Sequence, residues 1–298
     1  MNSPLTRSSF RNFHRLRVRW AEVDMQKIVF NGHYLMYFDT AMADYWRALA
    51  LPYEEAMHQL GGDLYVKKAS LEYFASAHYD DTLDVGLTCS RLGNSSLTFS
   101  GGIFAGDKLL VTGELVYVYA NPATQTSQPM PQALRDVLTA YEAGEAMTRT
   151  EVGDWQRLGT DAGRLRKDVF VHEQGIPESE EWDARDSTAV HAVVYNRLNM
   201  PLATGRLLMA GPDYGPKTAL IGRMATARAL RGAKLGGQVL DALVQRAQQR
   251  GDSEVVLHAQ QSAAAFYAKA GFLERGGVFQ EVGIPHVEMA RALGQPSQ

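Results

Sequence analysis

The sequence has one cysteine, no long apolar run and no marked excess of positive or negative charge. The 298 residues include a single cysteine, Cys89, which excludes an internal disulfide, and no cysteine or histidine spacing is typical of a metal site. No apolar run approaches the length of a membrane span, and the polar first ten residues lack the apolar core of a signal peptide. A formal net charge of −3 gives no electrostatic reason to expect binding to nucleic acid or an anionic membrane. We therefore expect a cytoplasmic protein that holds no metal and carries Cys89 as a buried, inert thiol.

The length of the chain predicts two domains, because 298 residues exceed what a single hydrophobic core usually organises. The composition is ordinary for a globular protein, with 45% hydrophobic, 21% charged and 9% aromatic residues. Between two patterned halves, residues 142–153 are polar and small and have no hydrophobic period. We place the boundary in this stretch and expect domains at 1–145 and 146–298.

The first half predicts one long helix followed by an antiparallel meander. Residues 13–20 alternate apolar side chains with arginines, which is typical of a strand with one solvated face. From Leu35 the apolar period becomes helical, with Asn31 as a suitable N-cap and Leu51-Pro52 as the stop. Further strands are expected at residues 65–74, 82–92, 95–105 and 108–120, and a second helix after Pro131.

The second half alternates strands and helices, which favours a mixed sheet with parallel strands. A Gly-rich loop at residues 231–237 joins a strand to a helix. The expected strands lie at residues 189–196, 201–210, 218–226 and 254–259, and the expected helices lie at 161–170, after the Gly-rich loop, and at 262–270. The predicted fold class is α+β, with a long helix wrapped by an antiparallel sheet and then an α/β domain with a mixed sheet.

The most informative segment of the first half is residues 18–34 (VRWAEVDMQKIVFNGHY), in which a strand leads to a lone carboxylate, Asp24, and then to a helix start. Cleaving a thioester needs a nucleophile or a base, together with donors for the developing oxyanion. Asp24 can attack the acyl carbon or activate water, while the amides around Phe30 to Gly32 and the helix dipole can polarise the carbonyl. Asn31 can orient water or substrate through its side-chain amide. The alternative interpretation keeps Asp24 as a loop carboxylate that caps the helix without chemistry.

This segment and the following meander resemble the hotdog-fold acyl-CoA thioesterases of the 4-hydroxybenzoyl-CoA and YbgC-like group, over roughly residues 13–140. The family motif has an aspartate, a Gly-containing loop, an Asn or His seven residues later and a Tyr ten residues later, which Asp24, Asn31 and Tyr34 match. The resemblance implies a hotdog domain, with Asp24 as the catalytic carboxylate and Asn31 and Tyr34 in the same site. It also implies a site shared between two subunits of a homodimer or homotetramer, with Ser95 in a hairpin that approaches CoA.

One position departs from the family pattern and two other features have ordinary explanations. Lys27 stands where the family usually has a glycine, so its side chain narrows the acyl pocket or contacts phosphate. We expect His33, on the helix face, to be structural or solvated. The arginines of the first strand are expected to form its solvated face rather than a nucleic-acid patch; they are Arg15, Arg17 and Arg19.

The Gly-rich loop of the second half, residues 231–237 (RGAKLGG), has the character of a site for the pyrophosphate of CoA. A strand-to-helix turn of small residues can bind pyrophosphate with main-chain amides and the helix dipole. A short Gly-rich loop is a weak signal by itself. The small residues permit close approach of the backbone, and two cations add positive charge; the residues expected to bind are Arg231, Gly232, Lys234, Gly236 and Gly237.

The surroundings of this loop resemble the GCN5-related N-acetyltransferases (GNAT), and specifically their ElaA-like branch, over about residues 154–291. The family loop reads Arg/Gln-x-x-Gly-x-Gly/Ala, which Arg231 and Gly236 fit, whereas Lys234 replaces the first glycine. The segments that carry the resemblance are VFVHEQGIP at 169–177, LIGRMAT at 220–226 and HAQQSAAAFYAKAGF at 258–272.

The GNAT resemblance implies transfer of an acetyl group from acetyl-CoA to an amine that the sequence does not identify. It implies that the backbone of Met224 and Ala225 pairs with the pantetheine arm, that Ser262 contributes to CoA binding, and that Tyr267 protonates the departing thiolate as general acid. The alternative for Tyr267 is a core aromatic beside Phe266. The base that activates the amine is open between Glu173 and water. An acidic run either attracts a cationic amine or is a solvated loop; it comprises Glu178, Glu180, Glu181, Asp183 and Asp186.

Three hypotheses follow for the whole chain. The leading one is a bifunctional protein with an acyl-CoA thioesterase followed by an acetyl-CoA-dependent N-acetyltransferase. In the second, only one half is active, because both loops depart from their family patterns at a lysine. In the third, the acetyltransferase half only binds acetyl-CoA and acts as a sensor that regulates the thioesterase or a partner.

Overall fold

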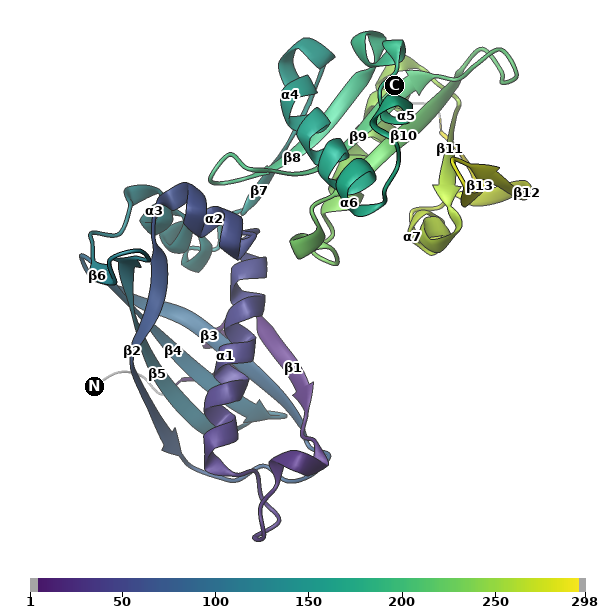
Figure 1. Cartoon of the computed structure of the whole chain (residues 1–298). Helices are drawn as coiled ribbons and strands as arrows, with labels where there is room; N and C mark the ends of the chain where they lie inside the picture. The colour runs from purple at the N-terminus through teal and green to yellow at the C-terminus, as the bar shows by residue number, and fades with distance from the viewer. Residues whose placement is uncertain (1–4, 295–298) are drawn as a thin grey trace. The chain divides into compact units, whose positions relative to one another are not determined.

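The chain divides between Met147 and Thr148 into two units, each with its own sheet (Figure 1). The computed structural model describes residues 5–294 of the chain. The division lies two residues beyond the expected one at 145/146, because Thr148 already pairs with Asn196 in the sheet of the second unit.

The first unit is an antiparallel sheet with a long helix across it, as the sequence predicted (Figure 1). The strand order is β1-β3-β4-β5-β2, and a short strand β6 pairs with β5. The strands are β1 (Phe13–Arg17), β2 (Asp63–Tyr73), β3 (Thr82–Leu92), β4 (Ser96–Ala105), β5 (Lys108–Asn121) and β6 (Thr126–Ser127). The α-helices are α1 (Asn31–Ala48), α2 (Tyr53–Leu60) and α3 (Gln132–Glu142).

Helix α1 packs on the sheet at a place where two glycines face it. Gly101 of β4 pairs with Gly113 of β5, and a Cβ atom at these positions would come within 2.3 Å and 2.7 Å of the Phe38 ring. The fully buried ring of Phe38 therefore rests on bare backbone. Leu35, expected on the buried face, is 40% exposed, because the buried stripe begins one residue earlier, at Tyr34. The buried residues of α1 are Tyr34, Tyr37, Phe38, Ala41, Met42, Tyr45 and Trp46.

Two local expectations for the first unit were wrong, and one helix was not predicted. The strand expected over residues 13–20 ends at Arg17 and is followed by a 3₁₀ turn, Trp20–Glu22. Helix α2, which begins after Pro52, was not predicted. Cys89 is half-buried rather than buried, although burial still raises the pKa of its thiol to about 12, so the thiol stays protonated near neutral pH.

The second unit is a seven-stranded mixed sheet in the order β12-β13-β11-β10-β9-β8-β7. Strands β10 and β11 are parallel and all other neighbours are antiparallel. The strands are β7 (Thr148–Gly153), β8 (Val190–Asn196), β9 (Pro201–Met209), β10 (Thr218–Thr226), β11 (Glu254–Gln260), β12 (Leu273–Glu281) and β13 (Ile284–Ala292). The α-helices are α4 (Trp155–Arg166), α5 (Glu178–Glu181), α6 (Leu235–Arg250) and α7 (Ala264–Lys269).

Helices α4 and α6 cover opposite faces of this sheet. Val193 of β8 packs against Leu158 of α4. The neighbouring residue, Ala192, points to the other face and pairs with Gly205, where a Cβ atom would meet Val239 of α6 at 2.8 Å. The two-sided cover explains why β8 and β9 are buried along almost their whole length.

Several elements of the second unit differ from expectation. The polar stretch expected to be a linker contains the edge strand β7. Helix α4 begins at Trp155 instead of residue 161 and continues as a π-helical segment, Lys167–Glu173. The last helix is shorter than the expected 262–270, because residues 261–263 form a 3₁₀ turn before α7. The hairpin of β12 and β13 was not predicted. Across residues 5–294, none of the helices has both the length and the hydrophobicity that crossing a bilayer requires.

The packing of Phe38 on the glycine pair generates a stability prediction. Substitution G101A should lower the free energy of unfolding of the first unit by roughly 1–3 kcal/mol, because the added methyl group forces α1 away from the sheet. Urea unfolding followed by far-UV circular dichroism measures this change. The control T112A lies beside Gly113 on the opposite face of β5 and should shift the midpoint far less. Equal effects of the two variants would contradict this account of the docking.

Candidate active sites

Asp24 lies in a tight turn closed by a short antiparallel bridge. Val23 pairs with Val29, and the amide of Asp24 donates to the carbonyl of Ile28 at 2.9 Å. Oδ1 of Asp24 accepts a hydrogen bond from the amide of Gln26 at 2.8 Å, which fixes the turn. Oδ2 makes no hydrogen bond with any described residue, and Asp24 is half-buried. Asp24 therefore shapes its own loop with one oxygen and leaves the other available.

Lys27, the departure from the thioesterase pattern, adopts the left-handed backbone conformation with φ at +63°. Glycine reaches this region without steric cost, and other residues rarely occupy it. The lysine thus takes the conformation for which glycine is the usual choice, so the turn survives the replacement. Its side chain is exposed.

The start of α1 provides main-chain donors a few residues after Asp24. Asn31 is the first helical residue and not the N-cap as expected; the N-cap is Phe30, whose amide donates to the carbonyl of Glu22 at 2.9 Å. The next two amides, of Asn31 and Gly32, have no main-chain acceptor among the described residues. Free amides at the positive end of a helix are suited to hold a developing oxyanion.

A buried carboxylate that sequence reasoning missed, Glu22, holds this helix start in place. It is 3% exposed and accepts hydrogen bonds from the amide and guanidinium of Arg19 and from the hydroxyl of Tyr37 at 2.9 Å. Burial by itself would raise the pKa of Glu22, but these hydrogen bonds outweigh burial and hold the pKa below its usual value. The spacing of Arg19 and Glu22 across a short turn was the only signal in the sequence, since Tyr37 meets them through the fold.

Tyr34 was expected in the catalytic set, and its environment gives it another role. The side chain is 2% exposed, and its hydroxyl accepts a hydrogen bond from the amide of Ala77 at 2.9 Å. Burial raises the pKa of Tyr34. The residue ties the segment after β2 to the helix start. The nearby His33 packs edge-to-face on Phe30, in line with a structural role.

Ser95, expected beside CoA, lies at the other end of the sheet from the Asp24 loop. The hydroxyl of Tyr73, at the end of β2, donates to the carbonyl of Asn31, and Tyr73 pairs with Val111 of β5. The strand that follows Ser95 begins at Ser96, which pairs with Val118. Seven residues along β5 span about 24 Å. Within one chain, Ser95 and Asp24 therefore do not belong to the same site.

The arginines of the first strand region each pair with a carboxylate. Arg15 contacts Asp84 at 2.7 Å, Arg17 contacts Asp80 at 2.9 Å, and Arg19 pairs with Glu22. These guanidinium groups remain largely exposed, as expected of a solvated face.

In the second unit, the Gly-rich loop turns into α6 with several amides unpaired. Gly232 has φ at +89°, and Lys234, the N-cap, has φ at +62°. Lys234 thus adopts the conformation that suits the glycine it replaces. In this loop and the first residues of α6, four amides have no main-chain acceptor among the described residues: those of Gly232, Lys234, Leu235 and Gly236. Such a concave group of donors at the start of a 16-residue helix suits a pyrophosphate.

Arg231, expected to add charge to this loop, is paired within the protein. Its guanidinium donates to both carboxylate oxygens of Glu173 at 2.6 Å and 2.7 Å, and its Nε donates to the carbonyl of Thr226. The pair fixes the loop and neutralises the charge. The hydrogen bond from Arg231 also lowers the pKa of Glu173, which makes Glu173 a poor base for an amine. Lys234 is the cation of the loop that remains free of an ion pair among the described residues.

Strands β10 and β11 diverge beside this loop. Their parallel pairing runs from Thr218 to Ile221 on β10 and stops there. A bulge follows, since the pairing of β10 with β9 skips two residues between Gly222 and Ala225. The β11-facing edge of β10 around Met224 and Ala225 is therefore unpaired, which is the geometry required for pairing with a pantetheine arm.

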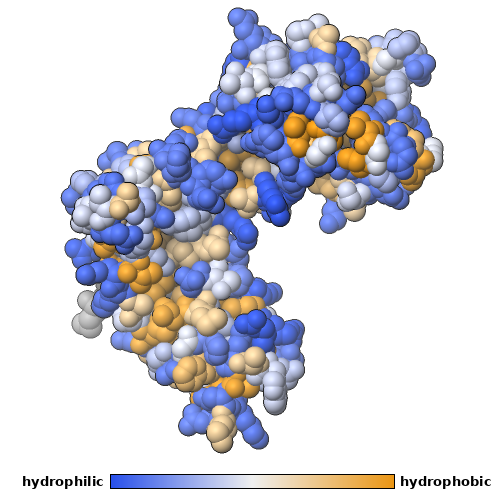
Figure 2. All heavy atoms as spheres, in the orientation of Figure 1, coloured by the Kyte–Doolittle hydropathy of each residue, from blue (hydrophilic) through white to orange (hydrophobic). Residues whose placement is uncertain are grey.

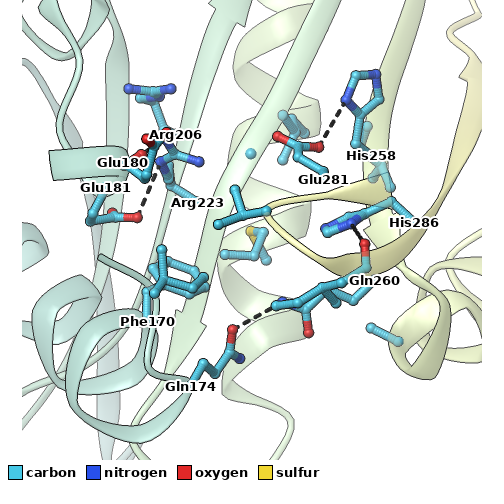
Figure 3. Close-up of a pocket in the computed structure, with 18 of the residues that line it drawn as sticks. Phe170, Gln174, Glu180, Glu181, Arg206, Arg223, His258, Gln260, Glu281 and His286 are labelled. Atoms are coloured by element: carbon cyan, nitrogen blue, oxygen red, sulfur yellow. Dashed lines mark hydrogen bonds and ion pairs between the residues drawn. The ribbon is translucent and has the colours of Figure 1, made fainter. Parts of the chain in front are cut away.

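A cavity of about 330 Å³ opens at this divergence (Figure 3). Its walls come from β10, β11, the π-helical segment and the β12–β13 hairpin. Tyr267 of α7 lines it and is 8% exposed, and its hydroxyl makes no hydrogen bond with any described residue. Burial raises the pKa of Tyr267 to about 12, which keeps its proton in place near neutral pH. Ser262, expected to contribute to CoA binding, is exposed in the 3₁₀ turn before α7.

His286 of β13 lines the same cavity and was missed by sequence reasoning. It is 9% exposed, and its Nδ1 lies 2.8 Å from the carbonyl oxygen of Ile284. A carbonyl can only accept, so Nδ1 carries the proton and, in the neutral ring, the lone pair is on Nε2. Within the described chain Nε2 has no hydrogen-bond partner, so it is available as a base.

The second histidine of the cavity, His258 of β11, is already engaged. Nδ1 lies 3.5 Å from Glu281, and Nε2 lies 3.3 Å from the hydroxyl of Tyr214, which itself donates to Glu288. The contact with Glu281 raises the pKa of His258. His258 therefore suits a structural cation better than a free base.

The acidic run is neither a solvated loop nor an amine trap as a whole. Glu181 and Asp186 are buried against the guanidinium of Arg166, which is 1% exposed. Asp183 accepts from Arg206, another buried arginine, at 2.8 Å. Glu178, by contrast, forms an exposed ion pair with Lys167 and Glu180 is exposed, in line with a solvated segment.

The buried position of Glu22 generates a prediction with a defined pH dependence. Substitution E22Q should lower the free energy of unfolding of the first unit by about 1–3 kcal/mol at pH 7, because charge-assisted hydrogen bonds from Arg19 and Tyr37 are weakened. The folded-state pKa of Glu22 is depressed, so its contribution exists above the pKa of the unfolded chain and is lost as pH falls through the folded value. Urea titrations at pH 7 and pH 4 should show the gap between wild type and E22Q narrowing. A gap of constant size would show that the charge of Glu22 is not what stabilises the helix start.

Two family models match the chain, one in each unit. Residues 26–112 match the thioesterase superfamily, and residues 209–293 match the acetyltransferase (GNAT) domain. A putative esterase of Aquifex aeolicus is 33% identical over 94 residues, which cover 32% of this chain and 73% of that protein.

The second unit has curated and solved relatives. Protein ElaA of Escherichia coli is 35% identical over 134 residues, which cover 44% of this chain and 86% of that protein. The crystal structure of a putative N-acetyltransferase from Lactobacillus plantarum matches at 31% identity with a TM-score of 0.45, over 50% of this chain and 99% of that chain. The chain therefore belongs to the thioesterase superfamily through its first unit and to the GNAT acetyltransferase family through its second.

Proposed function

We propose that the chain is a bifunctional CoA-dependent enzyme, in which the first unit hydrolyses acyl-CoA thioesters and the second transfers an acetyl group from acetyl-CoA to an amine. The observation that carries the proposal is the cavity between β10 and β11, where Tyr267 and His286 both line the wall beside the Gly-rich loop's strand. A protonated tyrosine and a histidine with a free lone pair are the acid and base that aminolysis of a thioester requires.

The transferase step uses groups that the second unit already positions. The amides between Gly232 and Gly236 hold the pyrophosphate of acetyl-CoA, and the open edge of β10 pairs with the pantetheine arm. Nε2 of His286 accepts a proton from the ammonium of the acceptor. The free amine then attacks the acetyl carbonyl, a C–N bond forms, and the C–S bond breaks. Tyr267 gives its proton to the departing thiolate, and the proton lost by the tetrahedral adduct passes to solvent.

The hydrolase step draws on the Asp24 turn and the start of α1. The free Oδ2 of Asp24 attacks the acyl carbon or removes a proton from the attacking water, and the amides of Asn31 and Gly32 stabilise the oxyanion. When water attacks, the C–S bond breaks, the proton held by Asp24 passes to the departing thiolate, and the acyl group leaves as a carboxylic acid. When Asp24 attacks, the C–S bond breaks, the thiolate takes a proton from solvent, and water then hydrolyses the acyl–Asp24 anhydride. The roles of Asp24 and Asn31 rest on the family motif, on the Oδ2 atom of Asp24 without a hydrogen bond, and on the unpaired amides at the start of α1.

We further propose that the first unit acts as a homodimer or larger homo-oligomer. Strand β2 lies at the end of the sheet order and pairs, among the described residues, only with β5. Apolar side chains on and after it are exposed, including Val66, Tyr73 and Phe74, and Figure 2 shows apolar patches on the surface of this unit. An exposed apolar edge strand is suited to association with a second copy. Ser95 lies far from Asp24 within one chain, so a second copy would bring its own Ser95 to the Asp24 site of the first.

The two activities should respond separately to substitution of Asp24. D24A should lower acyl-CoA hydrolysis by roughly 10²- to 10⁴-fold while acetyl transfer stays unchanged, because the two sites share no residue. Release of CoA thiol from short, long and aromatic acyl-CoAs measures hydrolysis; the one protein thiol, Cys89, has a raised pKa and adds little background. The control is D107A, a fully exposed carboxylate in the turn between β4 and β5. Unimpaired hydrolysis in D24A would remove the assignment, and loss of both activities would contradict independent sites.

Acid and base roles in the second unit can be separated by their kinetics. Y267F should lower kcat for acetyl transfer by roughly 10²-fold or more with little change in the KM for acetyl-CoA. Because the pKa of Tyr267 is raised to about 12, the wild-type rate should not fall between about pH 8 and about pH 9.5 through loss of this proton. H286Q should also lower kcat by roughly 10²-fold, because it removes the proposed base, with little change in the KM for acetyl-CoA. Acetyl-CoA binding without transfer to any amine in the wild-type protein would favour a sensor instead.

A further inference from the structure

Arg223 lies at the most irregular point of the cavity wall. It falls within the bulge of β10, and its φ of +53° places a non-glycine residue in the left-handed region. Such conformations persist where the surrounding structure enforces them, and they concentrate at functional sites. The bulge turns the Arg223 side chain into the cavity, where Figure 3 shows it on the wall beside Glu180 and Glu181.

The carboxylates near Arg223 are largely used by two other arginines. The guanidinium of Arg166 donates hydrogen bonds to Oε1 of Glu181 and to both carboxylate oxygens of Asp186. The guanidinium of Arg206 donates to both carboxylate oxygens of Asp183 and, together with Arg166, to Oδ1 of Asp186. These two guanidinium groups are 1% and 3% exposed and are held in place by their partners. The third guanidinium, that of Arg223, makes longer contacts with the same carboxylates, to Glu181 and Asp183.

The charge of Arg223 is incompletely compensated. Its Nε is buried without a hydrogen bond and lies 3.5 Å from Oε2 of Glu181. Its Nη2 lies 3.8 Å from Asp183 and donates only to the main-chain carbonyl of Glu180, at 3.2 Å. Nη1 makes no hydrogen bond with any described residue. Burial lowers the pKa of Arg223, which reflects a cation short of anionic partners.

The opposite wall of the cavity holds His286, the proposed base for the amine. Figure 3 shows His258, Glu281 and His286 together on the side formed by β11 and the β12–β13 hairpin, across from Arg223. The cavity volume of about 330 Å³ is at the small end of the range for ligand pockets. An acceptor that fills it therefore touches both walls.

We propose that the acetyl acceptor is a small amine that also carries a carboxylate, and that Arg223 binds this carboxylate while the amine lies at His286. The inference rests on the proposed acetyl transfer and names the substrate class of that site. A carboxylate supplies the anionic oxygens that the open Nη1 end of the guanidinium lacks, and arginine is well matched to planar carboxylates. The carboxylate takes no part in the bond changes and only fixes the amine at the reacting carbon.

Paired acceptors that differ only in the carboxylate test the proposal. We would measure kcat/KM with acetyl-CoA for β-alanine against β-alaninamide, glycine against glycinamide, and 5-aminopentanoate against pentylamine. For at least one pair, the wild-type protein should favour the carboxylate about tenfold or more, because a charge-assisted hydrogen bond is worth about that factor. R223Q should abolish the preference by raising the KM for the acceptor, with the KM for acetyl-CoA unchanged, and R223K should retain part of it.

The matched control is R185Q, which removes a nearby cation that is 60% exposed and pairs with Asp183 at 3.4 Å. It should keep the preference, which would show that a specific contact and not the general positive potential selects the carboxylate. Thermal melting of R223Q and R223K identifies any loss of folding. Equal use of the carboxylate and its neutral partner by wild type in every pair, or an unchanged preference in R223Q, would overturn the inference while acetyl transfer itself stands.

A binding measurement separates this inference from the proposed function. If no amine is acetylated, the proposed transfer fails, and calorimetry with the CoA-bound protein then decides the inference. Binding of 5-aminopentanoate that exceeds binding of pentylamine and is lost in R223Q would support a carboxylate site at Arg223. Equal or absent binding of the two would overturn it.

Discussion

The first amides of an α-helix have no acceptor inside the helix, and both candidate sites are organised by this constraint. In the first unit, Asn31 and Gly32 open α1 beside Asp24; in the second, the amides after Gly232 open α6. In each unit, the loop before the helix contains a lysine in the left-handed conformation: Lys27 in the first unit and Lys234 in the second. Main-chain donors can therefore bind an oxyanion in one unit and a pyrophosphate in the other, and the surrounding side chains set the chemistry.

Buried charge fixes the geometry at the helix start of the first unit and beside the cavity of the second. Glu22 accepts from Arg19 and Tyr37 and, through its carbonyl, holds the amide that precedes α1. In the second unit, Arg166 and Arg206 are locked by three carboxylates beneath the cavity. Buried ions tolerate few arrangements because each needs specific partners. The cation left with weak partners beside that network, Arg223, lines the cavity.

Much of the fold follows from local pattern in the sequence. Strands β3 and β10 have the expected bounds, and β4, β5, β8 and β9 each differ by one residue at one end, because alternation of apolar side chains reflects the strand itself. The elements that were missed lack that signal. Strand β12 is almost entirely exposed and has no buried face to produce alternation, and β7 is a polar edge strand identified only by its pairing with β8. Both exist because a neighbour supplies hydrogen bonds.

The sequence by itself determined the Asp24 turn, the helix start at Asn31 and the loop at 231–237, since each is a run of a few residues whose backbone geometry is set locally. It also indicated Tyr267 through its motif. Only the tertiary structure decided the rest. His286 is the proposed base because β13 brings it to a cavity lined by β10 and β11, and Arg223 is the proposed carboxylate site because distant arginines bind the nearby carboxylates. The contacts of Tyr34 and Arg231 likewise come from the tertiary structure, because the burial of Tyr34 and the ion pair of Arg231 depend on residues far away in the chain, which no local motif contains.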